Sequence, residues 1–146
     1  PAYAIIEEQL SGQPSEIRAL AKSINDSLRK GTTDPNVPMM LMALYRPSVQ
    51  PYLISWFKHD PGAIISNLRL PVLIVQGDRD IQVSVHDAEL LKSSQPQARL
   101  QIIKDMNHVL KTCGSTDAAA QQATYTRPDL PVSEQLITVI EKFIKQ

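Results

Sequence analysis

Two segments of this chain hold the side chains best suited to catalysis. Gly77–Val83 contains the acids Asp78 and Asp80, and Lys104–Leu110 contains His108. Each segment directly follows a short apolar run. If those runs are neighbouring parallel strands, their carboxyl ends lie at one edge of the sheet, where functional groups gather. A carboxylate held against an imidazole is the supporting pair of a nucleophilic triad, so we expect one of the two acids to meet His108.

The two apolar runs predict a βαβ unit. Pro71–Gln76 and Ala98–Ile103 are short and largely apolar on both faces, as strands buried in a parallel sheet are. Between them, Ser84 is placed to cap a helix that runs to about Ser94, with Asp87 at its third position. The fold class expected for this part of the chain is therefore α/β.

The segments after the second run differ in pattern. Residues 112–131 are rich in Thr, Ala, Gln and Asp without usable periodicity, and we interpret them as a surface loop with one helical turn around 118–123. From Val132 to Lys145, apolar residues recur at helical spacing. This spacing predicts a final amphipathic helix that needs a sheet to lie on.

Ahead of the strands the sequence predicts helices only. Ser15–Lys30 has apolar residues at helical spacing, with Ser15 placed to cap its start. Shorter helices are expected within Tyr3–Leu10 and Pro47–Phe57, and Met39–Tyr45 is apolar on every side. We therefore expect short helices joined by turns that contain proline.

Composition and charge exclude several classes of function. The 146 residues include 15 basic and 15 acidic side chains, and a formal charge of zero argues against binding to nucleic acid or to an anionic membrane. No apolar run approaches the roughly 20 residues needed to cross a bilayer. The single cysteine, Cys113, can form neither an intramolecular disulfide nor a cysteine-based metal site. We expect no metal and no cofactor.

The cellular compartment stays open. No targeting signal is visible, and the chain begins with Pro1, so we expect a trimmed or excerpted chain in which any export signal would lie upstream. A lone cysteine favours the cytoplasm only slightly.

The segment from Pro71 to Val83, Pro-Val-Leu-Ile-Val-Gln-Gly-Asp-Arg-Asp-Ile-Gln-Val, is followed by the capped helix, a strand and then Met-Asn-His-Val at 106–109. This order resembles the last third of an α/β-hydrolase. In that family the acid follows its strand in a Gly-x-x-Asp pattern and the histidine follows the last strand. The resemblance therefore implies Asp80 as the catalytic acid and His108 as the catalytic base, with Asp78 in the turn, where an Asp can bond its own backbone.

The resemblance covers residues 60–146, and residues 1–59 look like the helical lid that this family inserts ahead of the acid-bearing strand. We place the domain boundary between a lid segment, 1–65, and a core segment, 66–146. Within this family, the segment Gln50–Phe57 together with Asp60-Pro61 is most similar to the sequences of bacterial serine aminopeptidases or esterases. The resemblance implies an apolar acyl pocket in the lid, and as its substrate-binding residues we take Met39, Met40, Trp56 and Phe57. The same residues can instead be core.

The nucleophile of that family is absent from this sequence. No two of the five glycines lie four positions apart, so there is no Gly-x-Ser-x-Gly elbow and no oxyanion hole built on it. We expect the carboxyl-terminal part of a serine hydrolase that cleaves ester, thioester or amide bonds of a small acyl substrate, inactive by itself. The alternative is a stand-alone binding or interaction module. Because two strands are too few to close a core, we also expect a homo-oligomer.

Other candidate groups have simpler interpretations. His86 lies inside the capped helix and is read as a surface side chain, and His59 precedes a helix cap at Asp60. A metal site from Asp78, Asp80, His86 and Asp87 matches no ligand motif. Cys113 follows the acid in the chain, whereas the nucleophile of this family precedes it, so an inert thiol is favoured.

Overall fold

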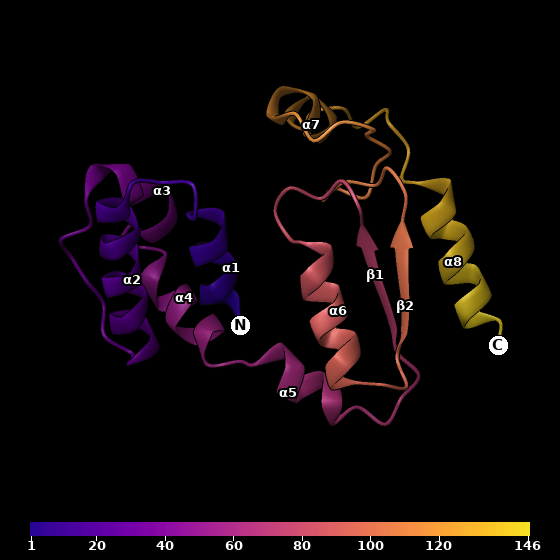
Figure 1. Cartoon of the computed structure of the whole chain (residues 1–146), viewed down its shortest axis with the longest axis horizontal. Coiled ribbons are helices and arrows are strands. Elements are labelled where there is room, and N and C mark those ends of the chain that lie inside the picture. The colour runs from indigo at the N-terminus through magenta and orange to yellow at the C-terminus, as the bar shows by residue number, and fades with distance from the viewer. The chain divides into compact units, whose positions relative to one another are not determined.

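The computed structural model describes all residues from 1 to 146, and the chain divides into two compact units, Pro1–Pro61 and Gly62–Gln146 (Figure 1). Each unit has its own core and is described by itself. None of the helices combines the length and the apolar character that a bilayer span requires.

The first unit is entirely helical. Its elements are α1 (Ala2–Gln9), α2 (Ser15–Arg29), the 3-10 turn η1 (Met39–Leu41), α3 (Met42–Tyr45) and α4 (Gln50–Phe57). Apolar residues from all of them, including the fully buried Leu28 and Tyr45, form one core. The helices predicted from apolar spacing are confirmed. The predicted cap is wrong, because Pro14 is the N-cap of α2 and Ser15 is already helical; proline pre-sets the backbone at a helix start.

Buried polar side chains link the helices of this unit. The Tyr45 hydroxyl donates to Asn25 Oδ1 over 2.9 Å, and Asn25 Nδ2 donates to Glu7. Gln50 Nε2 donates to the backbone carbonyls of Asp34 and Tyr45. Burial raises the pKa of Tyr45 to about 12, against a smaller lowering by its bond to Asn25. These bonds satisfy polar groups that would otherwise be costly to bury.

The second unit is an α/β unit built on two parallel strands. Its elements are α5 (Pro61–Ser66), β1 (Leu73–Gly77), α6 (Val85–Ser94), β2 (Arg99–Ile103), α7 (Ala118–Tyr125) and α8 (Glu134–Ile144). β1 and β2 pair from Leu73 with Arg99 to Gly77 with Ile103, so the predicted βαβ unit is confirmed. Ser84 and Asp87 form the predicted capping box of α6. Both strands end at the same edge of the sheet (Figure 1).

The two faces of this small sheet are covered by different helices. Side chains alternate along a strand, so Ile74 and Leu100 face α6, where they pack with Ala88. On the other face, Val75 and Ile103 pack against α8; the residues of this second cluster are Val75, Ile103, Met106, Leu136 and Val139. The helix predicted over 132–145 is confirmed, with slightly narrower bounds.

The segment 112–131 is more ordered than its composition predicts. It contains α7, which has two turns rather than one and whose first backbone N–H groups, at Ala119 and Ala120, donate to the Asp117 side chain. The helical turn predicted around 118–123 is therefore confirmed but too short, because α7 is held by individual polar contacts, which leave no periodic apolar signature. Figure 1 shows α7 beyond the carboxyl ends of β1 and β2.

Candidate functional site

The acid and the imidazole expected to meet lie in hydrogen-bond contact. His108 Nδ1 is 2.9 Å from Asp80 Oδ2, and the two residues follow β2 and β1 at the shared edge of the sheet. The Asp80 side chain is only 7% exposed, whereas the His108 side chain is 39% exposed. The pair therefore has a buried acid behind an imidazole that reaches the surface.

The carboxylate of Asp80 is held by four donors. Its Oδ1 accepts from the backbone N–H groups of Gln82 (2.8 Å) and Val83 (3.0 Å), and its Oδ2 accepts from Gln76 Nε2 (3.0 Å) as well as from His108. Burial alone raises the pKa of Asp80, but the hydrogen bonds from Val83, Gln82, His108 and Gln76 together outweigh it, so this pKa lies below its usual value. Asp80 is an anion at neutral pH.

This charge fixes the chemistry of His108. An ionised carboxylate can only accept, so the proton between the two groups belongs to Nδ1 of the imidazole. The neutral ring then carries its lone pair on Nε2, the nitrogen turned away from Asp80. An imidazole in this tautomer can take a proton at Nε2, and the carboxylate behind it stabilises the resulting cation.

The loops that carry the pair are tied to each other. Asp78 N donates to Ile103 O and Arg79 N to Met106 O, both over 3.1 Å. The Asp78 carboxylate accepts from the backbone N–H of Asp105 over 2.7 Å. Asp78 lies in the turn, as expected, and its carboxylate bonds the backbone of the neighbouring loop.

Gly77 explains how the loops come so close. A Cβ built on Gly77 would overlap the carbonyl oxygen of Met106 and lie 2.6 Å from the carbonyl carbon. Only glycine fits where the end of β1 passes the backbone of the loop that carries His108, Lys104–Leu110, which we call the histidine loop. Gly77, the glycine of the Gly-x-x-Asp pattern, thus allows the loops of Asp80 and His108 to lie close together.

Asn107 fixes the turn that presents His108. It is 1% exposed, accepts at Oδ1 from Lys111 N over 3.0 Å and donates from Nδ2 to Thr124 Oγ1 over 2.7 Å. Lys111 Nζ in turn donates to the backbone carbonyls of Thr124 and Arg127 at the end of α7. These bonds join the histidine turn to α7.

Helix α7 also contacts the loop of the acid. Gln121, 1% exposed, donates from Nε2 to Arg79 O over 3.0 Å and to Ser115 O, and Gln82 Nε2 donates to the Tyr125 hydroxyl. One short helix therefore holds both loops. Sequence reasoning missed Gln76, Asn107 and Gln121 as supporting residues; the only available signal was a polar side chain next to a predicted site residue.

The residues predicted to bind substrate lie in the first unit and differ in exposure. Met39 is 85% exposed, Met40 64% and Trp56 44%, whereas Phe57 is 8% exposed and packs edge-on against Tyr3 in the core. Among these four, Met39, Met40 and Trp56 are available at the surface.

The other side chains considered interact with groups outside the pair. His86 is 71% exposed on α6, as expected, and interacts with Glu89. The partly buried Cys113 donates from its thiol to Ser115 O. No group of three or more His, Cys, Asp or Glu side chains is arranged to hold a metal ion.

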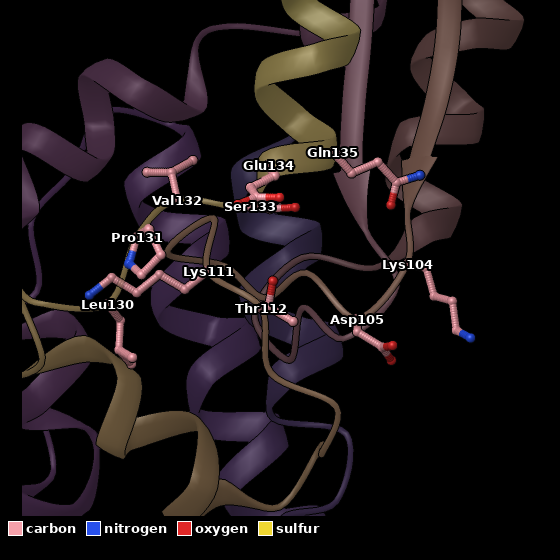
Figure 2. Close-up of a pocket in the computed structure, with 10 residues that line it drawn as sticks. All are labelled: Lys104, Asp105, Lys111, Thr112, Leu130, Pro131, Val132, Ser133, Glu134 and Gln135. Carbon is pink, nitrogen blue, oxygen red and sulfur yellow. The ribbon is translucent and has the colours of Figure 1, made fainter.

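A cavity of about 440 Å³ lies beside the histidine loop, and it contains neither member of the pair (Figure 2). Its charged lining residues are Lys104, Lys111, Asp105 and Glu134, two of each sign. The Lys111 ammonium is already bonded to carbonyls. Charges of both signs line the cavity and neither Asp80 nor His108 belongs to it, so the candidate site is the Asp80–His108 pair.

No protein-family model, curated protein or solved structure matches the chain.

Proposed function

We propose that Asp80 and His108 are the acid and the base of a hydrolytic Ser-His-Asp triad, and that this chain is the carboxyl-terminal part of a serine hydrolase of α/β-hydrolase type. The serine comes from a segment outside this chain. The single observation that carries the proposal is the 2.9 Å contact between a buried, four-fold hydrogen-bonded carboxylate and a surface imidazole at the exits of adjacent parallel strands.

The proposed mechanism uses the free nitrogen of His108. His108 Nε2 takes the proton of the serine hydroxyl as its oxygen attacks the carbonyl carbon of the substrate, and Asp80 stabilises the imidazolium that forms. The imidazolium then gives its proton to the leaving group, which leaves an acyl-serine. A water molecule activated in the same way at Nε2 releases the acid and restores the serine. The substrate is an ester, thioester or amide.

The acyl group of the substrate is proposed to be apolar. Met39, Met40 and Trp56 supply exposed apolar surface in the first unit, and methionine adapts to irregular shapes. Phe57 is buried against Tyr3, so it is not part of the proposed acyl-binding surface.

The test uses the full-length product of the coding sequence in which this chain lies. We expect it to contain an in-frame Gly-x-Ser-x-Gly ahead of Pro1, to react with a serine-directed fluorophosphonate probe and to hydrolyse short acyl esters or aminoacyl amides. Asp80→Asn is expected to lower kcat by about four orders of magnitude, because the wrong tautomer of His108 is then favoured. His108→Ala should lose probe labelling as well.

His86→Ala is the matched control, since His86 is an exposed histidine of the same unit. It should leave both labelling and hydrolysis unchanged. The absence of labelling and of hydrolysis in the unmodified protein, or their survival in His108→Ala, would overturn the proposal and favour a binding or interaction module.

A further inference from the structure

Gln76 is a polar side chain at a position where a buried strand usually carries an apolar one. It is partly buried near the end of β1, and its neighbour Val75 packs in the core. Its Nε2 donates to Asp80 Oδ2 over 3.0 Å and to the carbonyl of Val83 over 3.0 Å, with a longer contact of 3.3 Å to Gly77 O. A single amide therefore spans the Asp80 loop from its first residues to its last.

The charge of Asp80 determines which way this amide points. Turning the amide over would bring its oxygen against the carboxylate and against the Val83 carbonyl, which are both acceptors, so only the NH2 group fits there. The Oδ2 atom that accepts from Gln76 is also the one that accepts from His108. The two backbone donors hold Oδ1 alone.

We propose that Gln76 is a positioning residue of the pair: its amide holds Asp80 Oδ2 in the orientation in which that atom accepts the Nδ1 proton of His108. The effect of Gln76 on catalysis rests on the proposed function, whereas its positioning of Asp80 can be measured in this chain alone. Without the amide, Oδ2 keeps His108 as its single protein partner, and the carboxylate is free to twist about its bonds to Gln82 and Val83.

The experiment needs no nucleophile, because it uses nitrogen and proton NMR of the His108 ring in this chain. Gln76→Met keeps the length of the side chain and removes the donors. We expect the Nδ1 proton to exchange with solvent at least about fivefold faster, as the loss of one charge-assisted hydrogen bond implies. The ring nitrogen shifts should move from the Nδ1–H tautomer toward a mixture.

Gln101→Met is the matched control, because Gln101 is a partly buried glutamine of β2 that donates only to the nearby Ile102 carbonyl. It should leave the His108 signals unchanged. Gln76→Glu provides a second variant with the native shape, in which a second carboxylate faces Asp80, and it should broaden or abolish the Nδ1 proton signal.

An unchanged exchange rate and tautomer in both Gln76 variants would overturn the proposal, and so would an equal change in Gln101→Met. In the full-length protein, Gln76→Met should lower kcat about tenfold with little change in KM, since the variant alters the pair rather than the substrate surface. If the NMR effect occurs and the full-length protein has no hydrolase activity, the proposed function fails and the positioning role stands.

Discussion

Gly77→Ala is the substitution whose effect the structure specifies most closely. Alanine adds one Cβ, which would overlap the carbonyl oxygen of Met106. This Cβ would also lie 2.6 Å from the carbonyl carbon of Met106 and 3.1 Å from the Cβ of Met106. The atoms in the way are mainly backbone, so no side-chain rotation relieves the overlap. The end of β1 and the histidine loop must move apart.

The cost follows from what this separation breaks. The hydrogen bonds from Asp78 N to Ile103 O and from Arg79 N to Met106 O, both 3.1 Å, join the two segments. Each lost bond costs about 1 kcal/mol, and overpacking adds about 1–3 kcal/mol. We expect the free energy of unfolding of the second unit to fall by about 3–5 kcal/mol, a large part of the roughly 5–15 kcal/mol typical of a domain.

Urea unfolding followed by far-UV circular dichroism measures this change, and the NMR signals of His108 report whether the pair also separates. Gly114→Ala is the control, because a Cβ there meets nothing within 4 Å. It should change the free energy of unfolding by less than about 0.5 kcal/mol. If Gly77→Ala proves as mild as this control, the close approach of the two loops is not what positions the pair.

Three further results are expected. Because the pKa of Asp80 lies below its usual value, its stabilising contribution is complete above the ordinary aspartate pKa of about 3.9 and is lost as the pH falls through the lower folded-state pKa. The difference in unfolding free energy between the native chain and Asp80→Asn should therefore shrink from neutral pH to about pH 2, and a difference independent of pH would refute this. Asn107→Ala should cost about 2–3 kcal/mol in the same urea assay, since it removes the side-chain acceptor of Lys111 N and the amide that donates to Thr124 Oγ1. A loss below roughly 0.5 kcal/mol would show that water replaces the amide. Because the sheet has only two strands, each with an open outer edge, light scattering should detect a dimer or a larger assembly, and a monomer at every concentration tested would contradict this.

That an acid of the Gly77–Val83 loop meets His108 was predictable because it depends on sequence patterns that are local, and the resemblance then singled out Asp80 over Asp78. Two apolar runs of strand length, separated by a capped helix, leave few arrangements other than adjacent parallel strands. The residues that follow such strands must then share one edge of the sheet. Knowing the strands was therefore enough to bring together side chains far apart in the chain.

The supports of the pair could not be predicted in the same way. Gln121 and Asn107 each make a side-chain hydrogen bond to a group many residues away, and such bonds impose no spacing on the sequence. The partner of Asp78 was likewise missed, because its choice of Asp105 N depends on how closely Gly77 lets the loops approach. Polar tertiary contacts become visible only when the backbone is in place.

The loop that carries His108, Lys104–Leu110, contains two residues with left-handed backbone, Asp105 at φ 55° and Leu110 at φ 63°. Aspartate tolerates this conformation, but for leucine it costs roughly 1–2 kcal/mol. The bond from Leu110 N to Asn107 O, within the loop, and the bond from Ser133 N to Leu110 O, from outside it, offset that cost. A peptide of this loop transplanted into another scaffold would relax to a different shape, so an engineer who wishes to borrow the histidine must carry over the neighbouring helix and loop with it.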